Sequence, residues 1–174
     1  MSNIWFTSDT HFGHSNSIKY CNRPFASVEE MDEVLIERWN ERVKPSDTVW
    51  HLGDFAFHKS YDELQTLFSR LNGTKCLVIG NHDYDSTIRL FWHAAESIAT
   101  VHIGKQSVIL CHYAMRVWNK SHHGSLHLYG HSHGTLPGDS QSLDVGVDAW
   151  DYRPVNIDEI RDRLKTLPAR PKEF

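Results

Sequence analysis

Residues 78–83 read Val78-Ile79-Gly80-Asn81-His82-Asp83, and the prediction of the fold starts from them. They close a β-rich run, Lys75–Ile79, that is typical of a buried strand. Gly80 ends this run where a tight turn or the close approach of a ligand favours a residue without a side chain. Asn81 and His82 therefore stand just past the carboxyl end of a strand, where ligands bind in open α/β sheets. An amide oxygen beside an imidazole indicates metal or acid–base chemistry.

Four other predicted strands end in the same kinds of residue. They cover Asn3–Ser8, Thr48–Leu52, Gln106–Cys111 and Leu126–Tyr129. Any one polar residue at such a place could simply cap a helix or a turn. Five strand ends of this kind are hard to obtain without a shared site. The residues collected in this way are Asp9, His11, Asp54, Asn81, His82, His112, His131 and His133.

The first half of the chain alternates strands with helices, which is typical of an α/β core. Two helices are predicted from capping boxes that begin at Ser27 and Ser60. A short helix is expected over 85–95 and an amphipathic helix over 157–164, whereas 113–125 is expected to be a long loop. Further strands are predicted at Ile98–Ile103, near Leu143–Val147 and at Arg153–Asn156. No repeat or linker divides the chain, so residues 1–174 are predicted to form one domain.

The composition narrows the class of protein. The chain has 174 residues, of which 40% are hydrophobic and 23% are charged, an ordinary globular balance. Its net charge of −4 argues against an extended nucleic-acid partner but not against a single nucleotide. No apolar run is long enough for a membrane span and no signal peptide is recognised, so a cytoplasmic protein is expected. The 13 histidines are the unusual feature, and the three cysteines lack zinc-finger spacing.

The collected side chains predict a particular metal chemistry. They are carboxylates, imidazoles and an amide, without a thiolate, and such donors suit Mn, Fe, Zn, Co or Ni rather than a structural zinc cage. Seven ligands are too many for one ion and fit two ions with one bridge. Two ions roughly 3.5–4 Å apart clamp a phosphoryl group and generate hydroxide near neutral pH. The predicted ligands are Asp9, His11, Asp54, Asn81, His112, His131 and His133.

The order of these motifs resembles that of the calcineurin-like metallophosphoesterases, over residues 4–135. The motifs are Asp9-x-His11, Gly53-Asp54, Gly80-Asn81-His82-Asp83, His112 and Gly130-His131-x-His133. The resemblance implies a four-layer α/β/β/α sandwich, in which two mixed β-sheets are flanked by helices. It also implies two divalent ions, with Mn preferred, at the edge of the sheets.

The same resemblance implies a role for each residue. Asp9, His11 and His133 are expected to bind one ion, Asn81, His112 and His131 the other, and Asp54 both. A hydroxide between the ions is the implied nucleophile. His82 is expected to assist the leaving group, with Asp83 orienting it.

The expected substrate is a small phosphodiester or phosphomonoester, such as a nucleotide. Some members of the family carry Cys at the position of His82 and lean towards diesters, so His82 leaves monoesters open as well. A Ser/Thr protein phosphatase and a nuclease of the same superfamily are alternatives. Both are weakened because the chain lacks the insertions of those phosphatases and the capping domain of the repair nucleases. A catalytically silent metal-binding scaffold is a further alternative, although such a protein is expected to lose at least one ligand or His82. The sequence leaves the oligomeric state open.

Three residues are candidates for substrate contact. Arg23 follows the first motif, and Arg116 and Trp118 lie in the 113–125 loop, where a guanidinium suits a phosphate and an indole a base. The alternative for this loop is that its own aromatic residues clamp it. His14 and His51 are expected either to hold ligands in place or to make ordinary polar contacts. Packing or surface positions are expected for His58, His93, His102, His122, His123 and His127.

Overall fold

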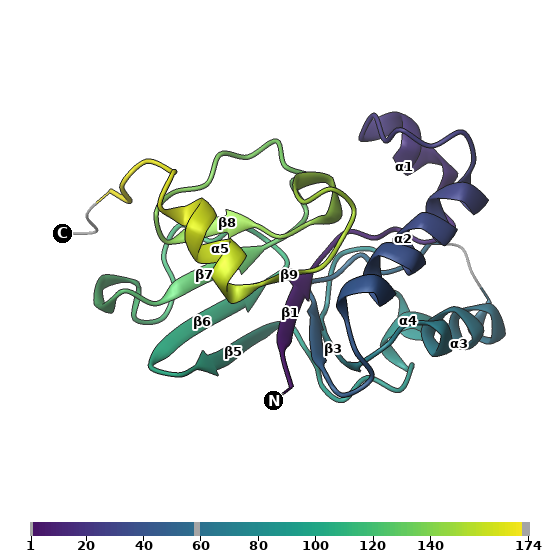
Figure 1. Ribbon diagram of the computed structural model, residues 1–174, viewed down its shortest axis with the longest axis horizontal. Coiled ribbons are helices and arrows are strands. Elements are labelled where there is room, and N and C mark those ends of the chain that lie inside the picture. Colours follow the sequence, from purple (N-terminus) through teal and green to yellow (C-terminus); the bar gives the residue numbers. More distant parts are fainter. Residues whose placement is uncertain (1, 58–59, 172–174) are drawn as a thin grey trace.

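We describe the protein from a computed structural model that covers residues 2–57 and 60–171; the prediction for His58 lies outside these residues. Strands and helices alternate in the first half and strands dominate the second (Figure 1). In chain order the elements are β1 (Ile4–Thr7), α1 (Ser15–Tyr20), α2 (Val28–Arg42), β2 (Thr48–His51), α3 (Tyr61–Arg70), β3 (Thr74–Val78), α4 (Asp85–Ile88), β4 (Ala95–Glu96), β5 (Ile98–Ile103), β6 (Gln106–Cys111), η1 (Ser121–His123), β7 (Leu126–Tyr129), β8 (Ser142–Asp144), η2 (Val147–Ala149), β9 (Val155–Asn156) and α5 (Ile157–Leu164).

The strands form two sheets, both of mixed direction. The first has the order β4-β3-β2-β1-β9, parallel except for β9, and the second has the order β5-β6-β7-β8, parallel except for β5. The carboxyl ends of β1, β2 and β3 therefore meet at one edge, and those of β6 and β7 meet at another. A bridge between Ser8 and Gly146 and a hydrogen bond from the Gly130 N–H to the His112 carbonyl join the connections at these edges.

Alternation along each strand divides the apolar residues between two cores. In β1, Trp5 packs with α2 and α3 residues such as Leu35 and Leu64, whereas the next residue, Phe6, belongs to the core between the sheets. Strand β6 contributes Val108 and Leu110 to that second core. Figure 1 shows α2, α3 and α4 on the side of the first sheet away from β5–β8. The expected fold class, two mixed sheets with flanking helices, is confirmed.

The other face of the second sheet is covered by the 113–125 loop. The Met115 N–H donates to His127 Nε2 at 3.0 Å, and the ring of Trp118 lies 5.1 Å from that of His127. His127 is buried in this contact, as expected for a packing histidine. The outer layer on this side therefore consists of a loop held by its own aromatic residues.

The helix ends follow the capping signals. The Ser27 hydroxyl accepts from the Glu30 N–H, and Ser60 forms a complete capping box with Glu63. The expected helix over 85–95 is wrong beyond Ile88, because the chain turns there and residues 95–96 pair with β3 as β4. Among the described helices, none has the length and apolar character required to cross a membrane.

The strand expected near Leu143–Val147 also ends early, at Asp144. The Asp144 carboxylate accepts a hydrogen bond of 2.6 Å from the Gly146 N–H, which turns the chain away from the sheet. Residues 147–149 then form the short helix η2. This turn carries Asp148 to the edge at which the predicted ligands lie.

Candidate metal centre

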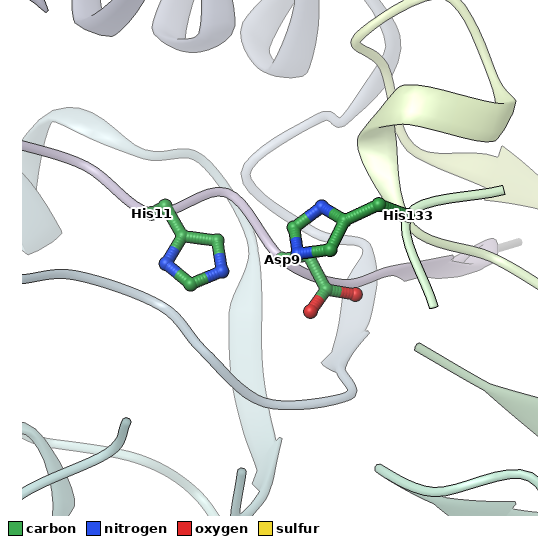
Figure 2. A group of neighbouring side chains, drawn as sticks. All are labelled: Asp9, His11 and His133. Atoms are coloured by element: carbon green, nitrogen blue, oxygen red, sulfur yellow. The ribbon is translucent and has the colours of Figure 1, made fainter. Parts of the chain in front are cut away.

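The structure brings the predicted ligands together at the strand ends in two groups. Asp9, His11 and His133 place one donor atom each within 4.8 Å of one another, and Asp54, His112 and His131 do the same. Figure 2 shows the first group, in which the rings of His11 and His133 turn towards the Asp9 carboxylate. Their ring centroids are 5.3 Å apart. Residues from the ends of β1, β2, β6 and β7 thus meet in one place, and Asn81 after β3 joins them through its Oδ1 atom, 3.0 Å from His112 Nε2.

The backbone at these ligands is unusual. Nine non-glycine residues among those described have a positive φ, and five of them are predicted ligands. This left-handed conformation costs free energy for such residues and concentrates at functional sites. It turns each side chain sharply away from the strand that precedes it. The five ligands are Asp9 (φ 56°), His11 (51°), Asp54 (58°), His131 (65°) and His133 (48°).

Glycines next to the ligands allow the strand ends to approach closely. A Cβ on Gly53 would lie 2.6 Å from the His112 imidazole and 2.7 Å from the Gly80 backbone. A Cβ on Gly130 would collide with Ser8 and with the Asp9 carboxylate. The motif glycines are therefore required for space at the site.

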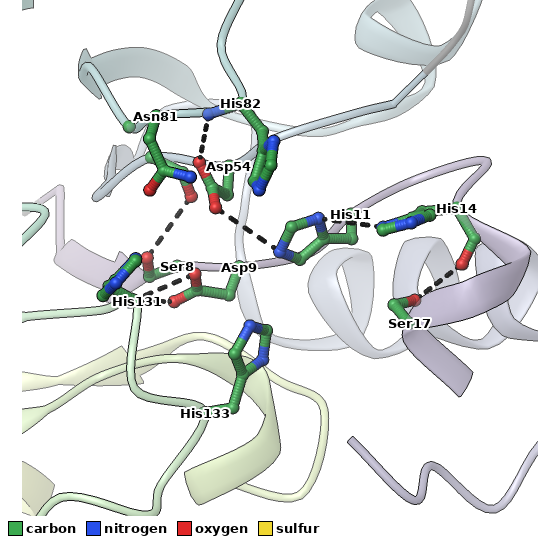
Figure 3. A network of polar contacts seen from close by, with 12 residues as sticks. Ser8, Asp9, His11, His14, Ser17, Asp54, Asn81, His82, His131 and His133 are labelled. Carbon is green, nitrogen blue, oxygen red and sulfur yellow. Dashed lines mark hydrogen bonds and ion pairs between the residues drawn. The ribbon is translucent and has the colours of Figure 1, made fainter. Parts of the chain in front are cut away.

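Asp54 lies between the two groups (Figure 3). Its Oδ2 atom is 3.5 Å from His11 Nε2 and 3.6 Å from His112 Nε2. Its Oδ1 atom accepts a hydrogen bond of 2.8 Å from the His82 N–H, which fixes the carboxylate plane. A carboxylate in this position can serve a cation on either side.

His112 presents an unprotonated nitrogen to the site. Its Nδ1 lies 2.7 Å from the Leu52 carbonyl oxygen, which only accepts, so Nδ1 carries the proton. The lone pair on Nε2 then faces the Asn81 Oδ1 atom at 3.0 Å, and that oxygen also accepts from the Tyr113 hydroxyl at 3.3 Å. Two acceptors facing each other beside a carboxylate fit a cation between them.

His11 gives a second sign of the same kind. Its Nε2 atom is buried without a hydrogen-bond partner, while its Nδ1 lies 3.4 Å from His14 Nδ1. Burial, with the nearby charge of Arg23, lowers the pKa of His11 to about 2 and keeps the ring neutral. A neutral, unpartnered imidazole nitrogen aimed at a carboxylate is suited to a metal ion.

Asp9 and His133 complete this first group. Burial raises the pKa of Asp9 well above its ordinary value, against the opposing effect of His133. Burial acts to lower the pKa of His133, but hydrogen bonds to Asp148 and Cys21 and the charge of Asp9 raise it to about 10. Both shifts show that this pocket favours added positive charge beside Asp9. The donor set and these surroundings fit divalent ions.

His82 borders the centre without joining either group of ligands. Its half-buried ring lies 5.7 Å from that of His11 and 5.3 Å from that of Phe57. Asp83 does not orient it as expected. The Asp83 carboxylate instead accepts three backbone hydrogen bonds of 2.8–2.9 Å, from Gly80, Asp54 and Phe55. Asp83 therefore ties the β2 and β3 ends together and acts on His82 only through the backbone.

Arg23 does not occupy the position expected for substrate contact. Its side chain is fully buried, and its guanidinium nitrogens donate to Asp148, to the carbonyls of Asp9 and Thr10 and to Met31. No part of it remains for a phosphate. The expectation failed because sequence position alone could not show where the side chain points.

The two candidates in the 113–125 loop also differ from the expectation. The Trp118 Nε1–H donates to the carbonyl and hydroxyl oxygens of Ser125 at 3.1 Å, and the side chain is buried. The Arg170 guanidinium lies 3.8 Å from its ring centroid. Arg116 is exposed and borders a separate cavity that also contains Met115. This loop is clamped by its own aromatic residue, the alternative that the sequence left open.

The other histidines divide into one that supports a ligand, one that makes an ordinary polar contact, and several at exposed positions. His14 stacks on Phe57 and contacts His11, so it supports a predicted ligand. His51 is buried and contacts Thr10 at 2.9 Å, an ordinary polar contact. Exposed positions hold His93, His102, His122 and His123.

Sequence reasoning missed Asp148. It lies in η2 beyond the last motif, and its Oδ2 is 2.7 Å from His133 Nδ1. The available signal was the pair of carboxylates in Asp144-Val145-Gly146-Val147-Asp148, which directly follows a predicted strand.

Comparison with known proteins agrees with this geometry. Residues 3–145 match the model of the calcineurin-like phosphoesterase superfamily domain. An uncharacterized protein, MJ1445, of Methanocaldococcus jannaschii is 35% identical over 162 residues, covering 92% of this chain and 90% of that protein. The gene 66 protein of Mycobacterium phage D29 is 30% identical over 199 residues, covering 96% and 98%.

A solved structure has the same fold. The protein of unknown function AQ665 from Aquifex aeolicus superposes with a TM-score of 0.76 at 26% identity, covering 94% of this chain and all of that one. The matched residues 3–145 include all seven predicted ligands. The chain belongs to the calcineurin-like phosphoesterase superfamily.

Proposed function

We propose that this protein is a dinuclear, metal-dependent phosphoesterase that hydrolyses a small phosphodiester or phosphomonoester. The observation that carries the proposal is the position of Asp54. Its Oδ2 atom lies 3.5 and 3.6 Å from two imidazole nitrogens that belong to different ligand groups. Two separate mononuclear sites would not need a carboxylate that is shared in this way.

The residues divide between the two ions as their positions suggest. Asp9, His11 and His133 would hold one ion, Asn81, His112 and His131 would hold the other, and Asp54 would serve both. Two divalent ions, with Mn preferred, would neutralise phosphoryl oxygens and activate a water molecule near neutral pH.

The protein itself supplies the leaving-group chemistry. His82 lies in the same cavity as His11 and Asp54 but outside both ligand groups. A protonated His82 would give its proton to the departing oxygen. The His82 N–H bond to Asp54 ties the position of this acid to that of the bridging carboxylate.

The cavity at the centre bears on the substrate. It has a volume of about 690 Å³ and extends from the ligands to α1, where it includes Ser17, Tyr20 and Asn22. Its described lining contains no Lys or Arg, so a substrate with several phosphates would lack partners for the extra charge. Tyr20 is 78% exposed, and its ring is available for stacking. These features favour one phosphoryl group attached to an uncharged, planar group, such as a nucleoside.

Hydrolysis of bis(p-nitrophenyl) phosphate by metal-free and Mn-loaded protein tests the proposal. We expect activity only with metal, and an Asp54→Asn variant prepared in the same way should lack it. A panel of nucleoside monophosphates, cyclic nucleotides, oligonucleotides and phosphopeptides then defines the substrate. Preference for oligonucleotides or phosphopeptides would replace the small-molecule assignment with a nuclease or a protein phosphatase. Metal binding without any hydrolysis would leave a silent scaffold.

A further inference from the structure

Arg23 and Asp148 form a buried ion pair although they are 125 residues apart in the chain. The Arg23 Nε–H and an Nη2–H donate to the two oxygens of Asp148, each at 2.8 Å. Their side chains are 0% and 6% exposed. Both oxygens of Asp148 and one edge of the guanidinium are thereby fixed in one geometry.

Each member of the pair also reaches a predicted ligand. Arg23 donates to the carbonyl oxygen of Asp9 at 2.7 Å and to that of Thr10 at 3.0 Å. These contacts hold the left-handed turn on which the Asp9 carboxylate depends. Asp148 Oδ2 lies 2.7 Å from His133 Nδ1. The pair therefore connects the β1 end with the loop after β7.

In the described part of the chain, neither Arg23 nor Asp148 makes a hydrogen bond to the other ligand group, and the Asp9 carboxylate reaches it only at the backbone N–H of His131. His112 is fixed by the Leu52 carbonyl, and Asn81 contacts His112 and the Tyr113 hydroxyl. Support from Arg23 and Asp148 is thus confined to Asp9 and His133, which belong to the same predicted ion. Asymmetry of this kind points to a role in one half of the centre.

We infer that Arg23 and Asp148 are positioning residues for the ion held by Asp9, His11 and His133, and that they leave the ion held by Asn81, His112 and His131 unaffected. A carboxylate that binds Nδ1–H of a metal-binding histidine fixes the ring orientation and makes Nε2 a better ligand. Asp148 is placed to do this for His133, and Arg23 holds the Asp148 carboxylate in place. The inference rests on the proposed dinuclear function.

Cys21 offers a competing explanation, because Cys21, His133 and Asp148 could themselves hold an ion. Cys21 Sγ lies 3.3 Å from His133 Nδ1. Both oxygens of Asp148, however, already accept from Arg23, and its positive charge opposes a cation at that place. The geometry favours positioning of His133 over a separate ion.

Metal affinity of the Asp148→Asn variant tests the inference. Metal-free protein would be titrated with Mn²⁺ against a chelator, with bound Mn counted and the exchange-coupled signal of a Mn pair followed by electron paramagnetic resonance. We expect wild type to bind two ions and the variant to bind one ion normally and the other about 10–100-fold more weakly, with the coupled signal lost. Asp148→Glu should restore part of the affinity, because it restores the carboxylate.

Two controls separate this effect from a general loss of structure. Glu159→Gln breaks the Arg42–Glu159 ion pair, which is also partly buried but touches no ligand, and should leave both Mn affinities unchanged. If Asp148→Asn leaves Arg23 unpaired and the protein unfolds, the double variant Arg23→Gln/Asp148→Asn removes both charges and should show the same single weak site. Cys21→Ser should bind both ions as wild type does.

The outcomes are distinguishable. Equal weakening of both ions in Asp148→Asn, or no weakening of either, overturns the inference while the dinuclear centre stands. Loss of an ion in Cys21→Ser overturns it in favour of the separate thiolate site. Wild-type protein that binds fewer than two ions overturns the proposed function, and the inference with it.

Discussion

The strand-end connections that carry the seven predicted ligands and the 113–125 loop look alike in sequence but differ in structure. Both are rich in polar, aromatic and histidine residues. At the strand ends, His11 Nε2 is buried without a partner, and His112 Nε2 faces another acceptor at 3.0 Å. In the loop, Trp118 and Ser125 satisfy each other's hydrogen-bonding groups. Unmet polar atoms therefore mark the predicted ligands, whereas the anchor of the loop is satisfied, although Ser121 Oγ is buried there without a partner.

The backbone separates the two regions as well. Five of the predicted ligands adopt a positive φ, whereas Lys120 is the single non-glycine residue of the described loop that does so. Strained backbone and unpaired acceptor atoms each cost free energy, and a bound cation can offset both costs. The Trp118 and Ser125 atoms that satisfy each other gain nothing from a ligand. The difference therefore predicts where substitutions affect metal binding and where they affect only stability.

Substitution of the bridging residue should have the largest effect. Asp54→Asn removes the charge that lies 3.5 and 3.6 Å from imidazoles of both groups. We expect both ions to bind more weakly and kcat/KM to fall by more than the roughly 10²–10⁴-fold typical of removing an acid catalyst. Metal content and hydrolysis of a nitrophenyl diester measure the two effects together.

His133→Ala is the matched comparison for Asp54→Asn, since it removes a ligand from one group only. It should lose one ion and retain the other. If Asp54→Asn keeps nearly normal turnover and metal content, the bridge is assigned to the wrong residue.

His82→Ala should separate leaving-group chemistry from metal chemistry. His82 belongs to neither ligand group, so the variant should retain both ions. We expect a loss of about 10²–10⁴-fold in kcat/KM on an alkyl or nucleoside ester, whose leaving oxygen needs a proton. On a nitrophenyl diester the loss should be much smaller, because nitrophenolate leaves without assistance.

The two substrates would be compared in parallel with measured metal content. An equal loss on both, with both ions retained, would make His82 a residue that binds the phosphoryl group. Loss of an ion would show that His82 is itself a metal ligand, and it would then have to be counted with the seven predicted ones.

Trp118→Ala should affect the second region alone. The side chain is 6% exposed and anchors the loop through Ser125. Removal of a buried Trp typically costs about 3–5 kcal/mol in the free energy of unfolding. Chemical denaturation should show a cost of this size, whereas Mn binding by the folded fraction should stay normal. Arg116→Ala, at an exposed position of the same loop, should change the unfolding free energy by less than about 0.5 kcal/mol.

The outcome for Arg116 and Trp118 also bears on substrate selection. Should either variant raise KM for the natural substrate without changing stability, the loop would contact substrate after all. The distinction between satisfied and unsatisfied regions would then fail as a guide to function in this protein.

The sequence predicted that the ligands come together, but it did not predict which residues hold them in place. Asp9, Asp54 and Asn81 follow strands, and parallel neighbours bring such ends to one edge whatever the details of packing. The partner of Arg23 could not be found in this way, because Asp148 is 125 residues away and no periodicity connects them. The direction of the Asp83 carboxylate was missed for a related reason: backbone N–H groups leave no mark in a sequence.

Two predictions of secondary structure were wrong because contacts formed in the folded chain overrode the local sequence pattern. The stretch after Ile88 reads as helical, yet the open edge of β3 accepts residues 95–96 as a strand. In the same way, the strand expected to reach Val147 stops because the Asp144 side chain takes the Gly146 N–H. Both errors arise from hydrogen bonds that become available only once the chain is folded.

His51 supplies a further test, beside the metal centre. It is buried beneath Thr10, whose hydroxyl donates to the Phe55 carbonyl, so His51 Nε2–H donates to Thr10 and Nδ1 is unprotonated. Burial, together with the nearby His112, lowers the pKa of His51 to about 3 from an ordinary value of 6.5. His51 is thus neutral in the folded protein over a range in which the unfolded chain binds a proton.

This shift fixes the sign of the pH dependence. The contribution of His51 to stability is fully present above pH 6.5 and is lost as the pH falls towards 3. In metal-free protein, His51→Gln should therefore reduce the slope of unfolding free energy against pH by about 1.4 kcal/mol per pH unit within that window. His11, with a pKa of about 2, titrates in the same direction in both proteins, so the difference between them isolates His51. Parallel unfolding curves for the two proteins from pH 6.5 to pH 4 would show that His51 is protonated or solvated in the folded state, and that burial near the ligands does not keep this imidazole neutral.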